Sequence, residues 1–164
     1  MKITFIKYFL LFIVVFISVF SCVKKTTYPT TPVIEFKAFY PYVGDSADLQ
    51  LKFTDGDGDI AVSSDNTIKN FWYTYYYKDT ITQLYRAYSI YNDSTGIYDT
   101  LRTGYPITLP DDSYKGKPIS GEISVRLQRF RHSKKIKNVK YVFYLFDQAG
   151  NKSNVVTSPE FNVQ

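Results

Sequence analysis

Residues 47–59 read ADLQLKFTDGDGD and join a strand pattern to an acidic turn. Apolar positions alternate strictly with polar ones in the first half: Ala47, Leu49, Leu51 and Phe53 against Asp48, Gln50 and Lys52. Successive side chains of a strand point to opposite faces of a sheet, so this pattern predicts a strand with one buried face. Three carboxylates separated by single glycines follow at once. That run raises the question of what holds three like charges together.

Similar strand patterns fill the chain after Pro32, and no stretch shows helical periodicity over ten residues. By analogy with the immunoglobulin fold we label the expected strands A 33–39, B 47–53, C 70–77, E 121–130, F 139–146 and G 154–163, with further short strands in 84–109. Pro159 predicts an edge strand or a bend in G. We therefore expect an all-β immunoglobulin/fibronectin-III-like β-sandwich of about 7–8 strands.

The N-terminus has the composition of an export signal. Lys2 and Lys7 precede an apolar run from Tyr8 to Phe20, which is short for a bilayer span of about 20 residues. Cys22 follows Ser21 and is the only cysteine, and VFSC resembles a lipobox except at Phe20. We predict a lipoprotein signal peptide at 1–21, a lipid (palmitate) on Cys22, a tether over 22–32 and a sandwich domain over 33–164. An uncleaved N-terminal anchor is the alternative.

Two loops of the expected sandwich carry candidate metal ligands. The B–C and F–G loops of this fold lie at the same end, which would bring Asp55, Asp57 and Asp59 toward Asp147 and Asn151. Ca²⁺ binds 6–8 oxygens from carboxylates, amides and main-chain carbonyls, and the spacing is not that of an EF-hand. Two hypotheses stay open: a Ca²⁺ site with these five ligands, and a solvated pair of turns.

The segments FTDGDGDI (53–60), GEISVRL (121–127) and FDQAGNKSNVV (146–156) resemble small uncharacterised lipoproteins of the Bacteroidota. That group typically carries a DGDGDIG-like loop and a D-x-x-G-N-x-S-N hairpin; Ala61 departs from its usual glycine. The resemblance implies an exported immunoglobulin-like domain and no particular activity. Surface lipoproteins of such bacteria often have acidic residues after the lipidated cysteine. The tether has none, which favours the periplasmic face of the outer membrane over the cell surface.

Aromatic residues make up 18% of the chain and suggest a second kind of site. Exposed faces of Trp72, Tyr76, Tyr85 and Tyr88 could stack on sugars. The competing interpretation is that they pack the core and favour strands.

Other classes of function find little support in the composition. Removing residues 1–21 takes away two lysines and no acid, so the net charge falls from +5 to +3. Such a charge, without a basic block among exposed aromatics, argues against nucleic acid. His132 is the only histidine, which rules out a Ser-His-Asp triad except through that residue. We predict a lipid-anchored, non-catalytic envelope module, structural or binding, with an unknown protein or glycan partner; the alternative is a glycan-binding accessory lipoprotein of polysaccharide uptake.

Overall fold

The computed structural model describes residues 27–62, 68–109, 113–128, 130 and 135–163. The expected signal peptide 1–21, the candidate lipidation site Cys22 and His132 lie outside these residues. The described chain forms strands, turns and irregular segments, and no helix occurs within it. The all-β prediction is therefore confirmed for the part of the chain that the structure describes.

The strands follow the expected order. Those predicted as A, B, C, E and F begin within two residues of the expected positions, whereas the one predicted as G is reduced to two short pieces. They are β1 Val33–Pro41, β2 Ser46–Asp55, β3 Phe71–Lys78, β4 Tyr85–Ala87, β5 Ser89–Asn92, β6 Ile97–Thr100, β7 Arg102–Tyr105, β8 Ile119–Gln128, β9 Asn138–Leu145, β10 Val156–Thr157 and β11 Phe161–Asn162. The region 84–109 does supply several short strands. The last predicted strand is divided at residues 158–160, as the proline suggested, and both halves pair with β9.

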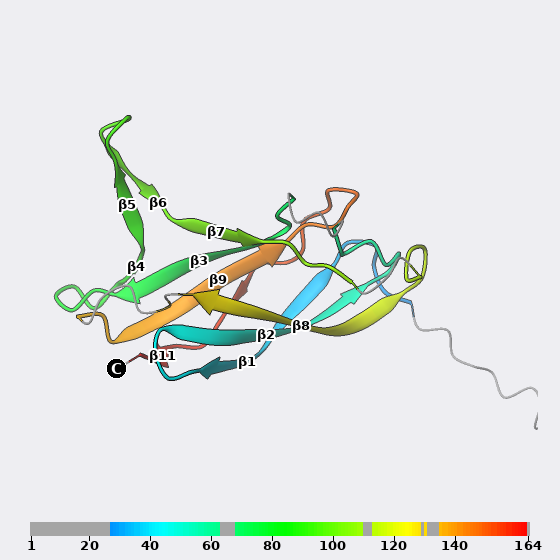
Figure 1. Ribbon diagram of the computed structural model, residues 1–164, viewed down its shortest axis with the longest axis horizontal. Helices are drawn as coiled ribbons and strands as arrows, with labels where there is room; N and C mark the ends of the chain where they lie inside the picture. Colours follow the sequence, from blue (N-terminus) through cyan, green and yellow to red (C-terminus); the bar gives the residue numbers. More distant parts are fainter. Residues whose placement is uncertain (1–26, 63–67, 110–112, 129, 131–134, 164) are drawn as a thin grey trace, which may run out of the picture.

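Two antiparallel sheets form the body of the molecule (Figure 1). One has the order β1-β2-β8. The other has the order β10-β9-β3-β4, with β7 also on β3 and β11 also on β9. The hairpin β5–β6 is a separate two-stranded ribbon. The alternating residues of β2 are buried as predicted, and the core cluster draws on both main sheets, so the two sheets pack face to face.

The core is unusually aromatic, because the inner faces of β3 and β9 carry tyrosine and phenylalanine. Tyr141 is 1% exposed and lies edge-on to Tyr73 and Tyr75, with ring centroids 5.7 and 5.6 Å apart. Phe39 of β1 stacks on Phe161 at 4.3 Å from the opposite sheet. Rings packed in this way bury large apolar areas and gain from edge-on contacts. Much of the aromatic content is therefore used in packing.

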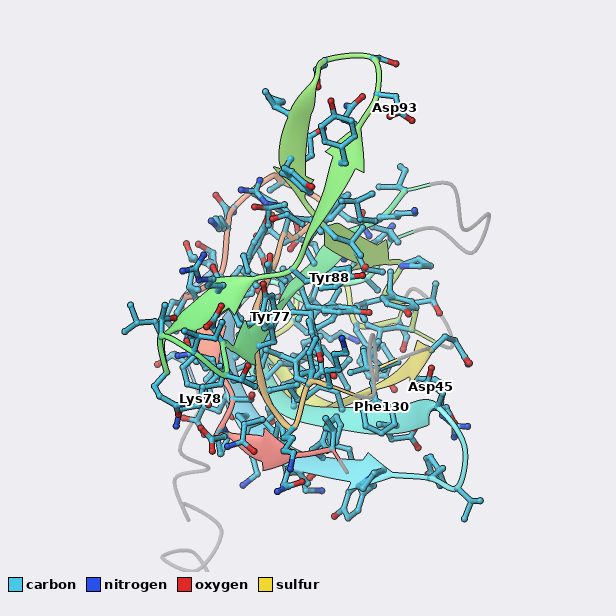
Figure 2. The ribbon with its side chains drawn as sticks, turned by 90° about the vertical axis from the view of Figure 1, so that its left-hand side faces the viewer. Asp45, Tyr77, Lys78, Tyr88, Asp93 and Phe130 are labelled. Atoms are coloured by element: carbon cyan, nitrogen blue, oxygen red, sulfur yellow. The ribbon has the colours of Figure 1, made fainter. Side chains whose placement is uncertain are left out.

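The two ends of the body differ. β2 ends on the side of the body where the described chain begins, and the C-terminus lies at the opposite side (Figure 1). The ribbon β5–β6 projects from the body, with Asp93 at its tip (Figure 2). Its side chains are largely exposed, as the fractions for Tyr91 (49%) and Tyr98 (72%) indicate. The end where the chain enters the domain is the end that carries the DGDGD loop.

Candidate metal centre

The DGDGD loop leaves the sheet and returns to the core within a few residues. Asp55 is the last residue of β2 and is 0% exposed, and Ile60 is again 0% exposed. The Ile60 amide donates a hydrogen bond of 3.1 Å to Oδ2 of Asp55. This bond closes the loop on itself. The loop is thus a compact bend anchored at both ends in the core.

The two glycines of the loop allow main chain from two distant segments to approach it. A Cβ added at Gly56 would overlap the carbonyl oxygen of Tyr28 and lie 2.7 Å from that of Pro29. A Cβ added at Gly58 would overlap the carbonyl oxygen of Tyr114, and Gly58 has φ +71°, a conformation that favours glycine. The loop therefore lies between the tether and the segment before β8.

A hydrogen bond fixes the second of these approaches. The amide of Gly116 donates to the carbonyl oxygen of Asp57 at 2.6 Å. This main-chain contact holds residues 113–118 on the loop. No side-chain pattern in the sequence predicts the contact between this segment and the loop.

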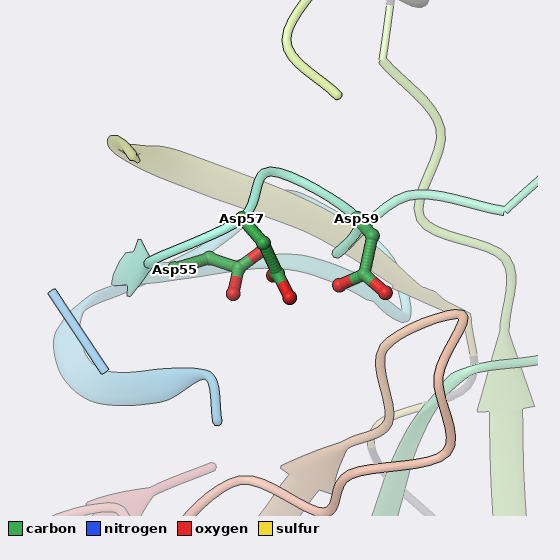
Figure 3. A group of neighbouring side chains, drawn as sticks. All are labelled: Asp55, Asp57 and Asp59. Atoms are coloured by element: carbon green, nitrogen blue, oxygen red, sulfur yellow. The ribbon is translucent and has the colours of Figure 1, made fainter. Parts of the chain in front are cut away.

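The three carboxylates of the loop converge. One oxygen from each of Asp55, Asp57 and Asp59 lies within 4.8 Å of the others. In Figure 3 the three side chains point to the same side of the loop. The cluster could hold a metal ion, because carboxylate oxygens are the ligands of hard cations.

Each of these carboxylates has a buried oxygen that accepts no hydrogen bond. The atoms are Oδ1 of Asp55, Oδ1 of Asp57 and Oδ1 of Asp59. No ion pair among the described residues involves the three aspartates. A buried, unpaired carboxylate oxygen is costly, since it has lost water and gained no donor. A cation between these atoms would remove that cost.

The electrostatics of the cluster follow from burial and from mutual repulsion. Burial, and then the negative charges of Asp57 and Asp59, raise the pKa of Asp55 to about 6. The pKa of Asp59 is raised by burial first and then by the charges of Asp147 and Asp57. Near neutral pH the cluster therefore carries charge that its surroundings resist. A bound cation favours the ionised form and would reverse both shifts.

The hairpin 147–151 also meets the loop, as the sequence predicted. The amides of Gln148 and Ala149 donate to Asp59, to its carbonyl oxygen at 3.0 Å and its Oδ2 at 3.1 Å. The predicted ligands Asp147 and Asn151, however, are engaged with each other. Oδ1 and Oδ2 of Asp147 accept from the amide and the side-chain Nδ2 of Asn151 at 2.7 and 2.8 Å. Asp147 thus stabilises its own hairpin and lies outside the group of converging oxygens.

Asn70 supports the site and was missed by sequence reasoning. It is 3% exposed, and its Nδ2 donates to the carbonyl oxygens of Ile60 (2.7 Å) and Phe146 (3.1 Å). Its Oδ1 accepts from the amide of Ile107 at 2.8 Å. Asn70 therefore joins the end of the acidic loop to β9 and to residue 107. A single asparagine before an aromatic strand gives no signal from which this role could be inferred.

The four predicted sugar-stacking residues are all half-buried and do not form one open platform. The Trp72 indole lies against Gly104, where an added Cβ would come within 2.9 Å of it. Lys140 Nζ sits 4.0 Å from the ring centroid of Tyr85. Tyr88 packs edge-on against Tyr75 and Tyr77. Tyr76 lies on β3 opposite Lys140 of β9 and Ala87 of β4. Neighbouring groups thus already occupy one face of several rings.

Comparison with known proteins adds no family to these observations. No protein-family model, no curated protein and no solved structure matches the chain. Within the described residues there is no helix of the length and apolar character needed to cross a membrane. The acidic cluster, with its buried and unpaired oxygens, is the feature on which a functional proposal can be built.

Proposed function

We propose that the protein is a lipid-anchored, non-catalytic module of the bacterial envelope whose membrane-proximal end is stabilised by Ca²⁺. The observation that carries the proposal is the convergence of three carboxylates, with one oxygen of each within 4.8 Å of the others. Each of these carboxylates also has a buried oxygen that accepts no hydrogen bond. Ca²⁺–oxygen distances are about 2.3–2.6 Å, so oxygens on opposite sides of one ion are about 5 Å apart. The spacing suits Ca²⁺ bound by Asp55, Asp57 and Asp59.

The fold supports a structural or binding role. The strand orders β1-β2-β8 and β10-β9-β3-β4 are those expected for strands A-B-E and G-F-C-C′ of an immunoglobulin/fibronectin-III-like sandwich. Domains of this architecture commonly act as spacers or adhesion modules. Cys22 and the tether 22–32 would join this module to the outer membrane, on the periplasmic face.

Thermal unfolding in EDTA and in millimolar Ca²⁺ tests the metal site. At 100 times the dissociation constant, Ca²⁺ should add about 2.7 kcal/mol to the free energy of unfolding. For a domain of this size the melting temperature should rise by several degrees. Asp57→Asn should abolish the rise, whereas Asp93→Asn at the tip of the β5–β6 ribbon should keep it. An equal melting temperature in EDTA and Ca²⁺ would refute the site.

The anchor is tested separately by metabolic labelling with a palmitate analogue. We expect label on the wild-type protein and none on Cys22→Ala. Label that survives this substitution would refute lipidation at Cys22.

Glycan binding is the second candidate, and the partial exposure of Trp72 favours it. The indole is half-buried on the outer face of β3, with Gly104 against one part of the ring. Flat, partly exposed aromatic rings are typical sugar-binding groups. A glycan array should then show carbohydrate binding that Trp72→Ala removes. An array without reproducible binding would leave the structural role as the better proposal.

A further inference from the structure

The tether contacts the acidic loop with main-chain oxygens. At Gly56, the three atoms nearest to an added Cβ all belong to the tether, and the two closest are the carbonyl oxygens of Tyr28 and Pro29. A carbonyl oxygen carries partial negative charge. The tether therefore brings its negative dipole ends to a loop that already holds three carboxylates.

The other side of the loop has the same character. The oxygens nearest to Gly58 are the carbonyls of Tyr114 and Lys117. Oxygens from three separate parts of the chain are thus gathered around one five-residue loop. Among these oxygens, the carboxylates of the loop repel one another unless a cation lies between them.

The most buried carboxylate of the cluster has an oxygen without a partner. Asp55 is 0% exposed, and its Oδ1 accepts no hydrogen bond. Oδ2 of the same carboxylate is satisfied by the Ile60 amide. Since one oxygen of a fully buried group is paired and the other is not, the site has a specific place for a positively charged ligand.

We propose that Ca²⁺ at Asp55, Asp57 and Asp59 acts as a clamp that holds the tether on the sandwich. This inference rests on the proposed Ca²⁺ site and adds a regulatory consequence to it. An ion bound by the three carboxylates fixes the bend at Gly56, against which the carbonyl oxygens of Tyr28 and Pro29 lie. With Ca²⁺ bound, residues 27–32 stay against the loop. Without Ca²⁺, they are released from it.

Hydrogen exchange of the full chain in detergent micelles tests the clamp. The probe is Ca²⁺ itself, compared with EDTA, and the readout is exchange of the tether amides of Thr27, Tyr28, Thr30 and Thr31. We expect Ca²⁺ to slow this exchange at least tenfold. Calorimetric titration of the same sample reports Ca²⁺ binding independently.

Gly56→Ala separates docking of the tether from the carboxylates. It keeps every aspartate but places a methyl group against the tether carbonyls, so the tether should exchange fast with or without Ca²⁺. Because coupling between two binding events is reciprocal, the Ca²⁺ affinity should also fall, by about tenfold. Gly121→Ala is the matched control, since its added Cβ would meet only the movable ring of Phe53. It should behave as the wild type.

Asp57→Asn provides a second variant if Gly56→Ala does not fold. Its tether exchange should be insensitive to Ca²⁺, while peptides from β3 and β9 remain protected. Ca²⁺ binding by calorimetry without slower tether exchange would overturn the clamp and leave the Ca²⁺ site standing. Absence of Ca²⁺ binding would overturn both.

Discussion

Asp48 and Asp55 lie near the two ends of β2 and have opposite surroundings. Asp48 accepts hydrogen bonds from Tyr42 (2.6 Å) and from the guanidinium of Arg126, which also lies over the Tyr42 ring. Those bonds, Arg126 first, lower the pKa of Asp48. Asp55 has one main-chain donor, no ion pair among the described residues, and two carboxylates beside it, and its pKa is raised to about 6.

This difference separates a carboxylate that is paired within the fold from one that suits the proposed metal site. At the Asp48 end the chain supplies its own cation. At the Asp55 end the described chain supplies main-chain amides but no cation, and one oxygen of each carboxylate is buried without a donor. A protein can tolerate such an end if an ion from solution completes it. The following experiments break or sharpen this comparison, from the largest expected effect to the smallest.

Gly58→Ala should open the acidic end. The new methyl group would overlap the Tyr114 carbonyl, and φ +71° would also become strained. We expect a loss of about 3–4 kcal/mol in the free energy of unfolding, measured by urea denaturation. Gly96→Ala is the control, because its φ is +70° but its nearest neighbour is Tyr91 Oη at 3.9 Å. It should cost about 1 kcal/mol; equal losses would contradict the packed loop.

The pH dependence of stability should have opposite signs at the two ends. Because the folded pKa of Asp55 is raised above an unfolded value of about 3.9, its contribution is fully present below about pH 4 and is lost as pH rises through about 6. A shift of this size corresponds to about 2–3 kcal/mol. Urea denaturation in EDTA measures this loss of unfolding free energy. The measurement is repeated from about pH 4.5 to about pH 7.5 in steps of about one pH unit.

Two further measurements identify the source of that pH dependence. Ca²⁺ should remove the loss at neutral pH, because bound ligands are held deprotonated. Asp55→Asn should flatten the profile. An unchanged profile in this variant would show that another group titrates. Asp48, with its lowered pKa, contributes stability above about pH 4 that is lost as pH falls.

Asp55→Asn should stabilise the protein in EDTA and destabilise it in Ca²⁺. The amide keeps an oxygen for the Ile60 amide and offers an NH₂ group to the unpaired oxygens of Asp57 and Asp59. In EDTA we expect a gain of about 1–2 kcal/mol, and in Ca²⁺ a loss relative to the wild type. Paired melting curves decide the point. Destabilisation in both buffers would mean that Asp55 has a purely structural role.

Asp48→Asn should have the smallest effect. The Asp48–Arg126 pair lies at the surface, where ion pairs contribute less than about 1 kcal/mol. The loss should be the same in EDTA and in Ca²⁺ and should shrink in high salt. A Ca²⁺-dependent loss, measured by the same melting curves, would mean that the two ends of β2 are coupled.

Strand alternation made the body of this fold predictable. The pattern of 47–53 predicted the inward residues of β2, and the proline of the last strand marked its division. The convergence of the loops 55–59 and 147–151 followed from the expected sandwich. These features depend on side-chain type and order, which give periodic or compositional signals in the sequence.

The surroundings of the candidate metal centre could not be predicted in the same way. The tether and residues 114–117 contact the loop through main-chain atoms at Gly56 and Gly58. A glycine in the sequence indicates that space is needed at its position, but it does not indicate which segment occupies that space. Asp147 was predicted as a ligand because its hairpin was expected to lie beside the acidic loop. Only geometry reveals that both its oxygens already accept from Asn151.

The interrupted outer strands have a consequence for crowding at a membrane. The final strand is divided into β10 and β11, and β1 has a register shift between Phe36 and Ala38. Continuous, flat edge strands invite pairing with a neighbouring molecule, whereas bulges and prolines discourage it. On the proposed lipid anchor, copies of this protein would share a two-dimensional surface at high local density. The irregular edge strands would then disfavour pairing of neighbouring copies into a common sheet.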